Sequence, residues 1–309
     1  MSYFVRVMLG EQSLHAADCF RDGVIGTDFD LLTDLTPMLK DTWIDSKKEL
    51  TEQYKKNRPN KSPVSVGLAC GAMWTVSKGI PVGGVVVSPT GQGTYAIGKV
   101  ISEYEYVKDA YLPHRRNVEW QPERIPATNF SESLLKALKL PLTCIDLSPY
   151  AEELEGFVNG RPRITISGSE DVESASRFAL EEILEEFLVA NWEHTEFGKS
   201  YNILTVDGKK VGQQFPSDTG PIDILALSKD EKEYLVIELK RGKANDRVVG
   251  QLLRYMGFVK KDLCQDGKTV RGAIVAHQDD LGMRNALSMV DDVEFYRYSI
   301  DFKLAIINR

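Results

Sequence analysis

Three side chains that together could hydrolyse a phosphodiester bond lie on two short apolar segments. Asp223 is in PIDILAL, and Glu238 and Lys240 lie two residues apart in YLVIELK. A carboxylate inside an apolar strand is costly unless a partner pairs with it or a ligand binds it. Paired carboxylates can hold Mg²⁺, which prefers them together with waters and phosphate oxygens. A neighbouring lysine could orient or deprotonate the attacking water.

A β-hairpin would bring the three side chains together. The polar run SKDEKE separates the two apolar segments, and pairing Leu227 with Tyr234 across it places Asp223 opposite Glu238. Because side chains alternate along a strand and cross-strand partners share a face, Asp223, Glu238 and Lys240 would project on one side. The core side would receive Ile222, Ile224, Leu235, Ile237 and Leu239. The alternative is that Asp223 is a turn or cap residue and that Glu238 and Lys240 form an ordinary surface ion pair.

The elements around this hairpin predict an α/β domain with a mixed central sheet. Ser174 to Trp192 has the apolar spacing of a helix, and a second helix is predicted from about Ala244 to Leu263. A strand in VRGAIVA, a helix around Met283 to Met289 and a strand-like VEFYRYSIDFKL follow. Helices and strands in this order typically form layers around one sheet.

The second of these helices is basic, although the chain as a whole is acidic. The formal net charge of the 309 residues is −7, which counts against a general affinity for nucleic acid. From Lys240 to Lys261, however, seven basic residues accompany one acid, Asp246. Such a run is often only a solvated face, but beside the three candidate residues it predicts a surface for DNA phosphates. Its candidates are Arg241, Lys243, Arg247 and Arg254.

Taken together, these residues resemble a known nuclease superfamily. The spacing GPIDILAL, six residues, YLVIELKRGKANDRVVGQLLRYMGFVKK is similar to that of the PD-(D/E)xK nucleases. The similarity is greatest to the catalytic domain of the NucS/EndoMS mismatch endonucleases and runs from about Glu173 to Leu304. It implies a restriction-endonuclease-like α/β core in which Asp223, Glu238 and Lys240 form the catalytic triad.

The same resemblance implies further site residues. Gln251 and Tyr255, four apart on one helix, match the QxxxY element that often accompanies this core. The family also carries a glutamate on the helix before the hairpin, and its LE-x-FL pattern aligns best with Glu185. Neighbouring glutamates compete for this role: Glu181, Glu182 and Glu186. Asp223, Glu238 and Glu185 would then hold Mg²⁺, with Mn²⁺ as a substitute.

The first half of the chain predicts a separate domain rich in β-strands. Turn signals between about Tyr150 and Asp171, such as Asn159-Gly160, mark a boundary between domains at 1–155 and 170–309. Short strands separated by Gly and Pro precede it and predict a small β-barrel-like domain. The segments GGVVVSPTGQGTYAIGKVISEYEY, HRRNVEW and IPATNF resemble the EVE/PUA-like module found ahead of Mrr-like restriction nucleases.

The second resemblance implies a reader of modified bases or unusual nucleic-acid features. An aromatic pocket would accept a flipped base by stacking and by edge hydrogen bonds. The stacking candidates are Trp43, Trp74, Tyr104 and Trp120, and the phosphate candidates are His114, Arg115 and Arg116. The alternative is that the aromatic residues belong to the core and that the basic triplet is a surface loop.

Three functions follow from these patterns. The first is a Mg²⁺-dependent endonuclease that cuts double-stranded DNA at modified bases, which would be modification-dependent restriction in antiphage defence. The second is a repair endonuclease for mismatched or branched DNA, and the third is a non-cleaving nucleic-acid reader, against which the intact triad argues. Cutting both strands needs two active sites or two visits, so we expect a homodimer.

Composition is that of an ordinary globular protein, with 42% hydrophobic and 27% charged residues. No apolar stretch approaches the ~18 residues of a membrane span, and MSYFVRVMLG lacks the form of a signal peptide. The cysteines are far apart and form no CxxC pair: Cys19, Cys70, Cys144 and Cys264. This argues against a zinc site or a disulfide framework, and it fits a reducing cytoplasm.

Overall fold

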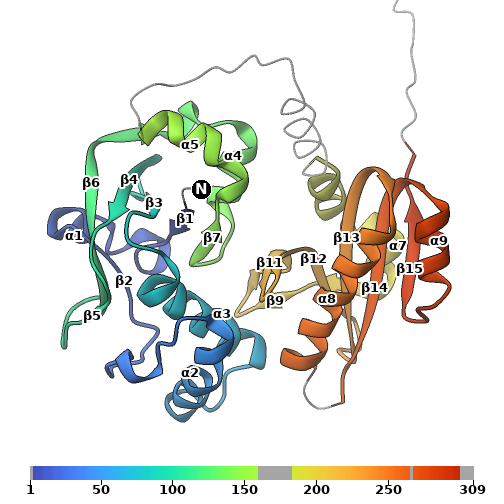
Figure 1. Ribbon diagram of the computed structural model, residues 1–309, viewed down its shortest axis with the longest axis horizontal. Coiled ribbons are helices and arrows are strands. Elements are labelled where there is room, and N and C mark those ends of the chain that lie inside the picture. The colour runs from blue at the N-terminus through green and yellow to red at the C-terminus, as the bar shows by residue number, and fades with distance from the viewer. Residues whose placement is uncertain (1–2, 159–182, 265–266, 300–309) are drawn as a thin grey trace, which may run out of the picture. The chain divides into compact units, whose positions relative to one another are not determined.

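Two units make up the chain in the computed structural model, which describes residues 3–158, 183–264 and 267–299. The units are Met1–Ser167 and Gly168–Arg309. Each unit has its own sheet and its own apolar clusters, and Figure 1 shows the helices packed around both sheets. The predicted class, α/β with α+β character overall, is therefore confirmed.

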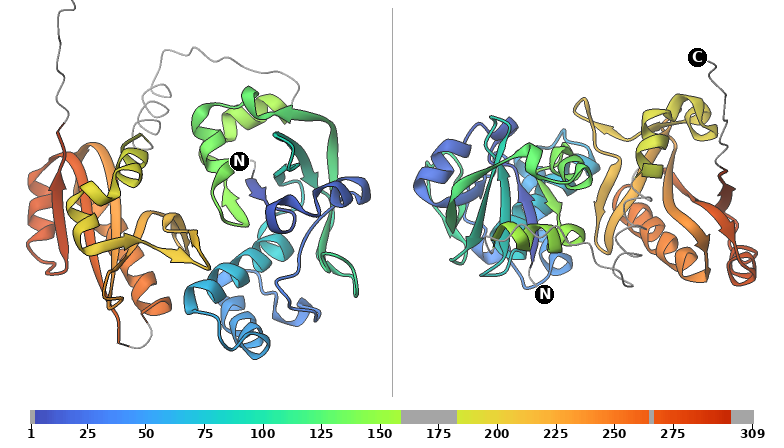
Figure 2. Two further views of the ribbon diagram at one scale, coloured as in Figure 1. Left: turned by 180° about the vertical axis from the view of Figure 1, so that it is seen from behind. Right: turned by 90° about the horizontal axis from the view of Figure 1, so that it is seen from above.

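One seven-stranded sheet forms the centre of the N-terminal unit (Figure 2). Its order is β2-β6-β4-β3-β1-β7, with β5 paired to β6. All described pairs are antiparallel except β1 with β3. The strands are β1 (Phe4–Val7), β2 (Val24–Thr27), β3 (Val85–Pro89), β4 (Thr94–Val100), β5 (Glu105–Tyr106), β6 (His114–Pro126) and β7 (Cys144–Asp146). Kinship with EVE/PUA-like modules stays a prediction.

Helices pack around this sheet, and three of them begin with a side-chain cap. The helices are α1 (Ala16–Asp22), α2 (Trp43–Asn57), α3 (Pro63–Trp74), α4 (Glu132–Lys139) and α5 (Ala151–Val158). The hydroxyls of Thr42, Ser62 and Ser131 accept backbone N–H groups at the starts of α2, α3 and α4. Leu50 of α2 and Met73 of α3 belong to one apolar cluster, so these two helices are held by side-chain packing.

His114 is buried and connects three segments of this unit. Its Nε2 contacts the carbonyl oxygen of Leu31, which only accepts, so Nε2 carries the proton. Nδ1 then accepts from the Tyr104 hydroxyl at 2.9 Å, and that hydroxyl accepts from the backbone N–H of Leu35 at 3.1 Å. Burial lowers the pKa of His114, which keeps the ring neutral. The structure thus gives His114 and Tyr104 internal partners.

The predicted phosphate contact at Arg116 is wrong. Arg116 is 2% exposed, and its guanidinium donates to the carbonyl oxygens of Ser102, at 2.7 and 2.9 Å, and of Ile80. The alternative of a surface loop is wrong as well, because the side chain lies in β6 at an inward position. Arg115, between the two inward residues, is half-buried and donates to the carbonyl oxygen of Leu112 at 2.6 Å.

A six-stranded sheet forms the centre of the C-terminal unit. Its order is β11-β12-β13-β14-β15, with β8 also paired to β12, and β9 and β10 form a separate hairpin. The strands are β8 (Tyr201–Ile203), β9 (Thr205–Val206), β10 (Lys209–Lys210), β11 (Gln213–Ser217), β12 (Gly220–Ser228), β13 (Glu233–Ala244), β14 (Thr269–Asp279) and β15 (Val293–Arg297). β13 pairs with β14 and β14 with β15 in parallel, which makes the sheet mixed.

The predicted hairpin register is confirmed. Leu227 pairs with Tyr234, and the ladder continues to Ile224 opposite Ile237. Leu235, Ile237 and Leu239 belong to the apolar cluster on one face of the sheet. The short polar loop thus sets which residues of the two strands pair, and this register places the apolar side chains of both strands on the core face.

Helices cover both faces of this sheet. Residues 183–190 are helical, and α7 (Glu196–Ser200), α8 (Asp246–Asp262) and α9 (Leu281–Leu287) follow. α8 begins after Ala244 because the Asn245 side chain accepts the backbone N–H of Arg247. Of the helix predicted at 174–192, residues 174–182 lie outside the described residues, as do residues 300–309 of the last predicted strand. Within the described residues no helix is long and apolar enough to span a membrane.

The buried His114 predicts a pH-dependent stability for the N-terminal unit. Because the pKa of His114 is lowered in the folded protein, the unfolded chain binds more protons below the ordinary histidine pKa of about 6.5. Stability should therefore fall as the pH drops from 7.5 to 5.5. In thermal unfolding of the full chain, His114→Gln should flatten this fall for the N-terminal unit. His194→Gln, at an exposed histidine, is the control, and equal slopes in both variants would contradict the assignment.

Candidate active site

Glu238 and Lys240 lie on the face of β13 that α8 covers (Figure 1). Val236 pairs with Gly272 of β14, and a side chain at Gly272 would collide with Met256 and Leu252 of α8. Glu238 follows two residues later on the same face and is 1% exposed. The Lys240 ammonium lies 2.8 Å from its carboxylate, and 26% of the Lys240 side chain is exposed. The alternative of an ordinary surface ion pair is therefore wrong for Glu238.

Asp223 fastens β12 to β13 just beyond their last ladder pair. Its Oδ2 accepts the backbone N–H of Leu239 at 2.8 Å. Leu239 lies between Glu238 and Lys240, so the carboxylate is held beside both residues. The alternative role of Asp223 as a turn or cap residue does not fit its position within β12.

Glu185 joins the same site through a residue that we did not predict. Glu185 is 5% exposed, and its carboxylate accepts from the side-chain amide of Gln214 on β11. The same amide nitrogen lies 3.5 Å from Asp223 Oδ1. This geometry favours Glu185 over Glu186, whereas Glu181 and Glu182 lie outside the described residues. Gln214 could have been found by folding QQFPS back onto GPIDI across the turn at Asp218–Thr219.

Gln251 and Tyr255 of α8 face this site. The Gln251 amide donates to the Tyr255 hydroxyl at 3.2 Å. Burial raises the pKa of Tyr255, and the charges of Glu238 and Asp223 raise it further. The hydroxyl also lies 3.3 Å from where a Cβ would stand at Gly220, whose φ of 126° favours glycine. The two members of the predicted QxxxY element therefore meet each other beside the turn that leads into β12.

The chemistry of the donor groups suits a hard divalent cation. Glu185 and Asp223 both contact the side-chain amide of Gln214, so their carboxylate oxygens lie close together and could bind one ion. Glu238 is a buried carboxylate near Asp223. Within the described part of the chain, no three carboxylate, histidine or cysteine side chains already form a complete metal centre. The residues thus fit the ion by their chemistry, with the Gln214 amide between two of them.

Basic side chains of α8 lie next to this face. Arg247 and Arg254 are exposed and lie on one stripe of the helix with Gln251. No described residue forms an ion pair with either arginine. For Arg241 and Lys243 the structure describes the backbone, within β13, and not the side chains.

The aromatic candidates of the N-terminal unit are all partly buried. The rings of Trp43 and Trp74 are half-buried, with centroids 6.2 Å apart, and the Lys47 ammonium lies 5.7 Å from the Trp43 ring. Trp120 packs edge-on against Phe20 at 4.9 Å. Trp43 and Trp74 are thus the two predicted stacking residues whose rings lie near each other, with a cation over one of them.

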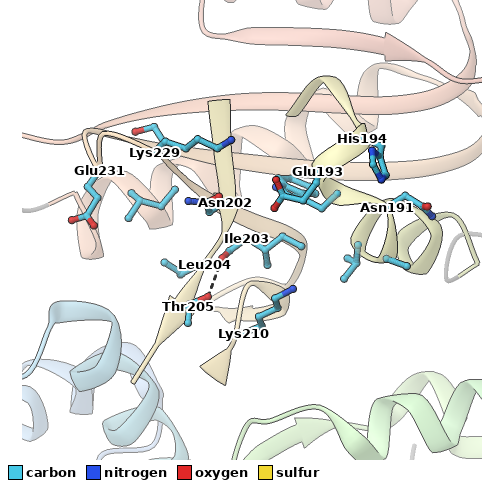
Figure 3. A pocket seen from close by; sticks show the side chains of 15 residues that line it. Asn191, Glu193, His194, Asn202, Ile203, Leu204, Thr205, Lys210, Lys229 and Glu231 are labelled. Atoms are coloured by element: carbon cyan, nitrogen blue, oxygen red, sulfur yellow. Dashed lines mark hydrogen bonds between the residues drawn. The ribbon is translucent and has the colours of Figure 1, made fainter. Parts of the chain in front are cut away.

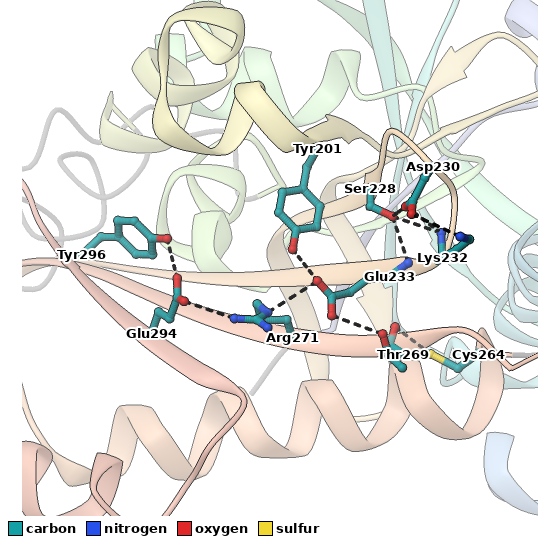
Figure 4. A network of polar contacts seen from close by, with 10 residues as sticks. All are labelled: Tyr201, Ser228, Asp230, Lys232, Glu233, Cys264, Thr269, Arg271, Glu294 and Tyr296. Atoms are coloured by element: carbon teal, nitrogen blue, oxygen red, sulfur yellow. Dashed lines mark hydrogen bonds and ion pairs between the residues drawn. The ribbon is translucent and has the colours of Figure 1, made fainter.

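Two other polar features lie away from the carboxylates. A cavity of about 540 Å³ is lined partly by His194, Asn202, Lys210 and Lys229 (Figure 3), and none of the predicted catalytic residues lines it. At the start of β13 to β15, Arg271 contacts Glu294 at 3.1 Å and Glu233 at 3.5 Å (Figure 4). Glu233 is five residues before Glu238, roughly 16 Å along the strand, so this network braces the opposite end of the sheet.

Comparison with known proteins identifies both halves separately. Residues 200–301 match the Endonuclease NucS C-terminal domain, and residues 6–140 match a domain of unknown function, DUF8426. The chain is 33% identical over 89 residues to Endonuclease NucS of Methanocaldococcus jannaschii, covering 29% of this chain and 32% of that protein. It is 26% identical over 162 residues to Endonuclease NucS of Pyrococcus horikoshii, covering 52% and 55%.

Solved structures of similar proteins were also found. An EndoMS–dsDNA complex aligns with a TM-score of 0.33 and 16% identity over 71% of this chain and 66% of that one. A repair endonuclease from Pyrococcus abyssi aligns with a TM-score of 0.29 and 19% identity over 70% and 65%. The chain spans between a third and just over half of the curated relatives' length. Its C-terminal half carries a NucS-like nuclease domain.

Proposed function

We propose that this chain is a metal-dependent DNA endonuclease that hydrolyses phosphodiester bonds at the C-terminal site. One observation carries the proposal. A buried carboxylate, Glu238, is held against Lys240 on the strand to which Asp223 is fastened. A buried carboxylate contributes little to the stability of a fold, so the presence of Glu238 in the sheet is best explained by a function. The similarity of residues 200–301 to the NucS domain supports the same chemistry.

The protein residues divide the work of hydrolysis. Asp223, Glu238 and Glu185 would hold Mg²⁺ or Mn²⁺, which would supply Lewis-acid polarisation of the phosphodiester and charge stabilisation of the leaving oxygen. Lys240, partly exposed, orients or deprotonates the attacking water and offsets negative charge that develops on the phosphate. Gln251 and Tyr255 lie where they can hydrogen-bond the same phosphate. Cutting both strands would need two such sites, so a homodimer is part of this proposal.

Mismatched or branched DNA is the substrate that we favour. The curated relatives share the name Endonuclease NucS with the matched domain, and the motif resembles that of mismatch endonucleases. Modification-dependent restriction in antiphage defence rests on the EVE/PUA resemblance alone, and the N-terminal match is to a domain of unknown function. If the substrate is mismatched or branched DNA, the Trp43–Trp74 pair would stack on a base at the distorted position.

Cleavage by the full chain distinguishes these substrates. With Mg²⁺, we expect cutting of mismatched or branched duplexes and little cutting of the matched duplex or of its hydroxymethylated or glucosylated forms. Trp74→Ala should reduce the preference, and Trp120→Phe, at a ring that packs against Phe20, is the control. Preferential cutting of a modified, perfectly paired duplex would favour restriction instead. An absence of cutting combined with tight binding would favour a non-cleaving reader.

Removing any member of the triad should reduce the rate of cleavage strongly. Asp223→Ala, Glu238→Ala and Lys240→Ala should each slow cleavage roughly 10²- to 10³-fold or more, because each loses a group that stabilises the transition state. Binding of the same duplex, measured by anisotropy, should change little. Glu193→Ala and Lys232→Ala remove matched exposed charges elsewhere in this unit. Near-normal cutting by Glu238→Ala would refute the assignment.

The exposed arginines of α8 predict a salt-dependent, sequence-independent contribution to binding. Arg247→Glu with Arg254→Glu should weaken binding to all duplexes alike and reduce the slope of log Kd against log salt by about 2. The reason is that each phosphate contact releases about one counterion. Lys229→Glu with Lys232→Glu, at two exposed residues of the loop between β12 and β13, serves as the charge-matched control. An unchanged slope would mean that this helix face is only solvated.

A further inference from the structure

Gln214 occupies an unusual position in β11. Gln213 pairs with Ile224 and Phe215 with Ile222, so Gln214 stands opposite Asp223. Its backbone has φ 49°, in the left-handed region that residues other than glycine rarely adopt. Such a backbone costs free energy and persists where its surroundings impose it, commonly at functional sites.

The side chain of Gln214 spans two acidic residues from different elements. Its Nε2 donates to Glu185 Oε2 on the helix at 183–190 and lies 3.5 Å from Asp223 Oδ1 on β12. Ionised carboxylates only accept hydrogen bonds, so the NH₂ group must face both of them. One amide therefore gives one N–H to each carboxylate and sets the distance between them.

We infer that Gln214 is a positioning residue that holds Glu185 and Asp223 at a fixed spacing and competes with a divalent cation for their oxygens. This inference rests on the proposed metal-dependent function. Two carboxylates close together repel each other, and the partial positive charge of the NH₂ group offsets that repulsion. A cation does the same more strongly and needs the same lone pairs. When the ion binds, the contacts between the Gln214 amide and the two carboxylates must therefore be lost or weakened.

Isosteric removal of the amide tests this competition. In the full chain, Gln214→Met keeps the length of the side chain but lacks the donor. Without added metal its unfolding temperature should fall, because the carboxylates repel. Its affinity for Mn²⁺, measured by electron paramagnetic resonance and calorimetry, should rise roughly three- to tenfold, as expected when a charge-assisted contact no longer competes. Gln213→Met, one residue earlier on the opposite face of β11, should change neither quantity.

A purely structural role gives a different result. If Gln214→Met lowers the unfolding temperature equally with and without Mn²⁺ and leaves the affinity unchanged, the inference is overturned. Should this variant fail to fold, Gln214→Asn keeps the amide but is too short to span both carboxylates, and the same rise in affinity is expected.

Asp223→Asn separates this inference from the proposed function. If it abolishes Mn²⁺ binding while Gln214→Met leaves the affinity unchanged, only the inference fails. If Asp223→Asn binds Mn²⁺ as tightly as the native chain, the proposed metal site fails and takes the inference with it.

Discussion

The contact between Glu238 and Lys240 is the constraint on which the C-terminal unit depends. The Glu238 carboxylate is 1% exposed and therefore desolvated, and the free-energy cost of that desolvation must be offset by a neighbouring positive charge. The sheet supplies that neighbourhood because β13 is central, with β12 on one side and β14 on the other. α8 closes over it, and only glycine at position 272 lets the helix approach so closely. The packing of α8 on the sheet and the pairing of Glu238 with Lys240 therefore require the same arrangement of β13, β14 and α8.

Much of this unit could be predicted because its strands obey simple alternation. The pairing of Leu227 with Tyr234 followed from a short polar loop and two apolar strands, and the structure has that register. Gln214 was missed because β11 has no periodic apolar pattern, and only its partner β12 gives it a place. Glu185 could be chosen only by the family pattern, since several glutamates share its helix.

In the N-terminal unit the basic residues of HRRNVEW were expected to contact phosphate, and two of them are buried instead. His114 and Arg116 lie two apart in β6, both inward, where a basic residue is unexpected. What makes them tolerable is long-range: carbonyl oxygens of Leu31, Ile80 and Ser102, each distant in sequence, accept their hydrogen bonds. The local sequence HRRNVEW cannot predict that these distant carbonyl oxygens will accept the hydrogen bonds. Buried polar groups are satisfied by the whole fold, so sequence alone assigned these residues to the surface.

The burial of Glu238 also makes inactive descendants easy to reach. A single nucleotide change converts a glutamate codon to glutamine, which has nearly the same shape and carries no charge to desolvate. Such a protein would keep its sheet, its helix and its exposed arginines, although Lys240 would lose its anionic partner. Under the proposed nuclease function, this architecture therefore lies one substitution away from a form that binds DNA without cutting it.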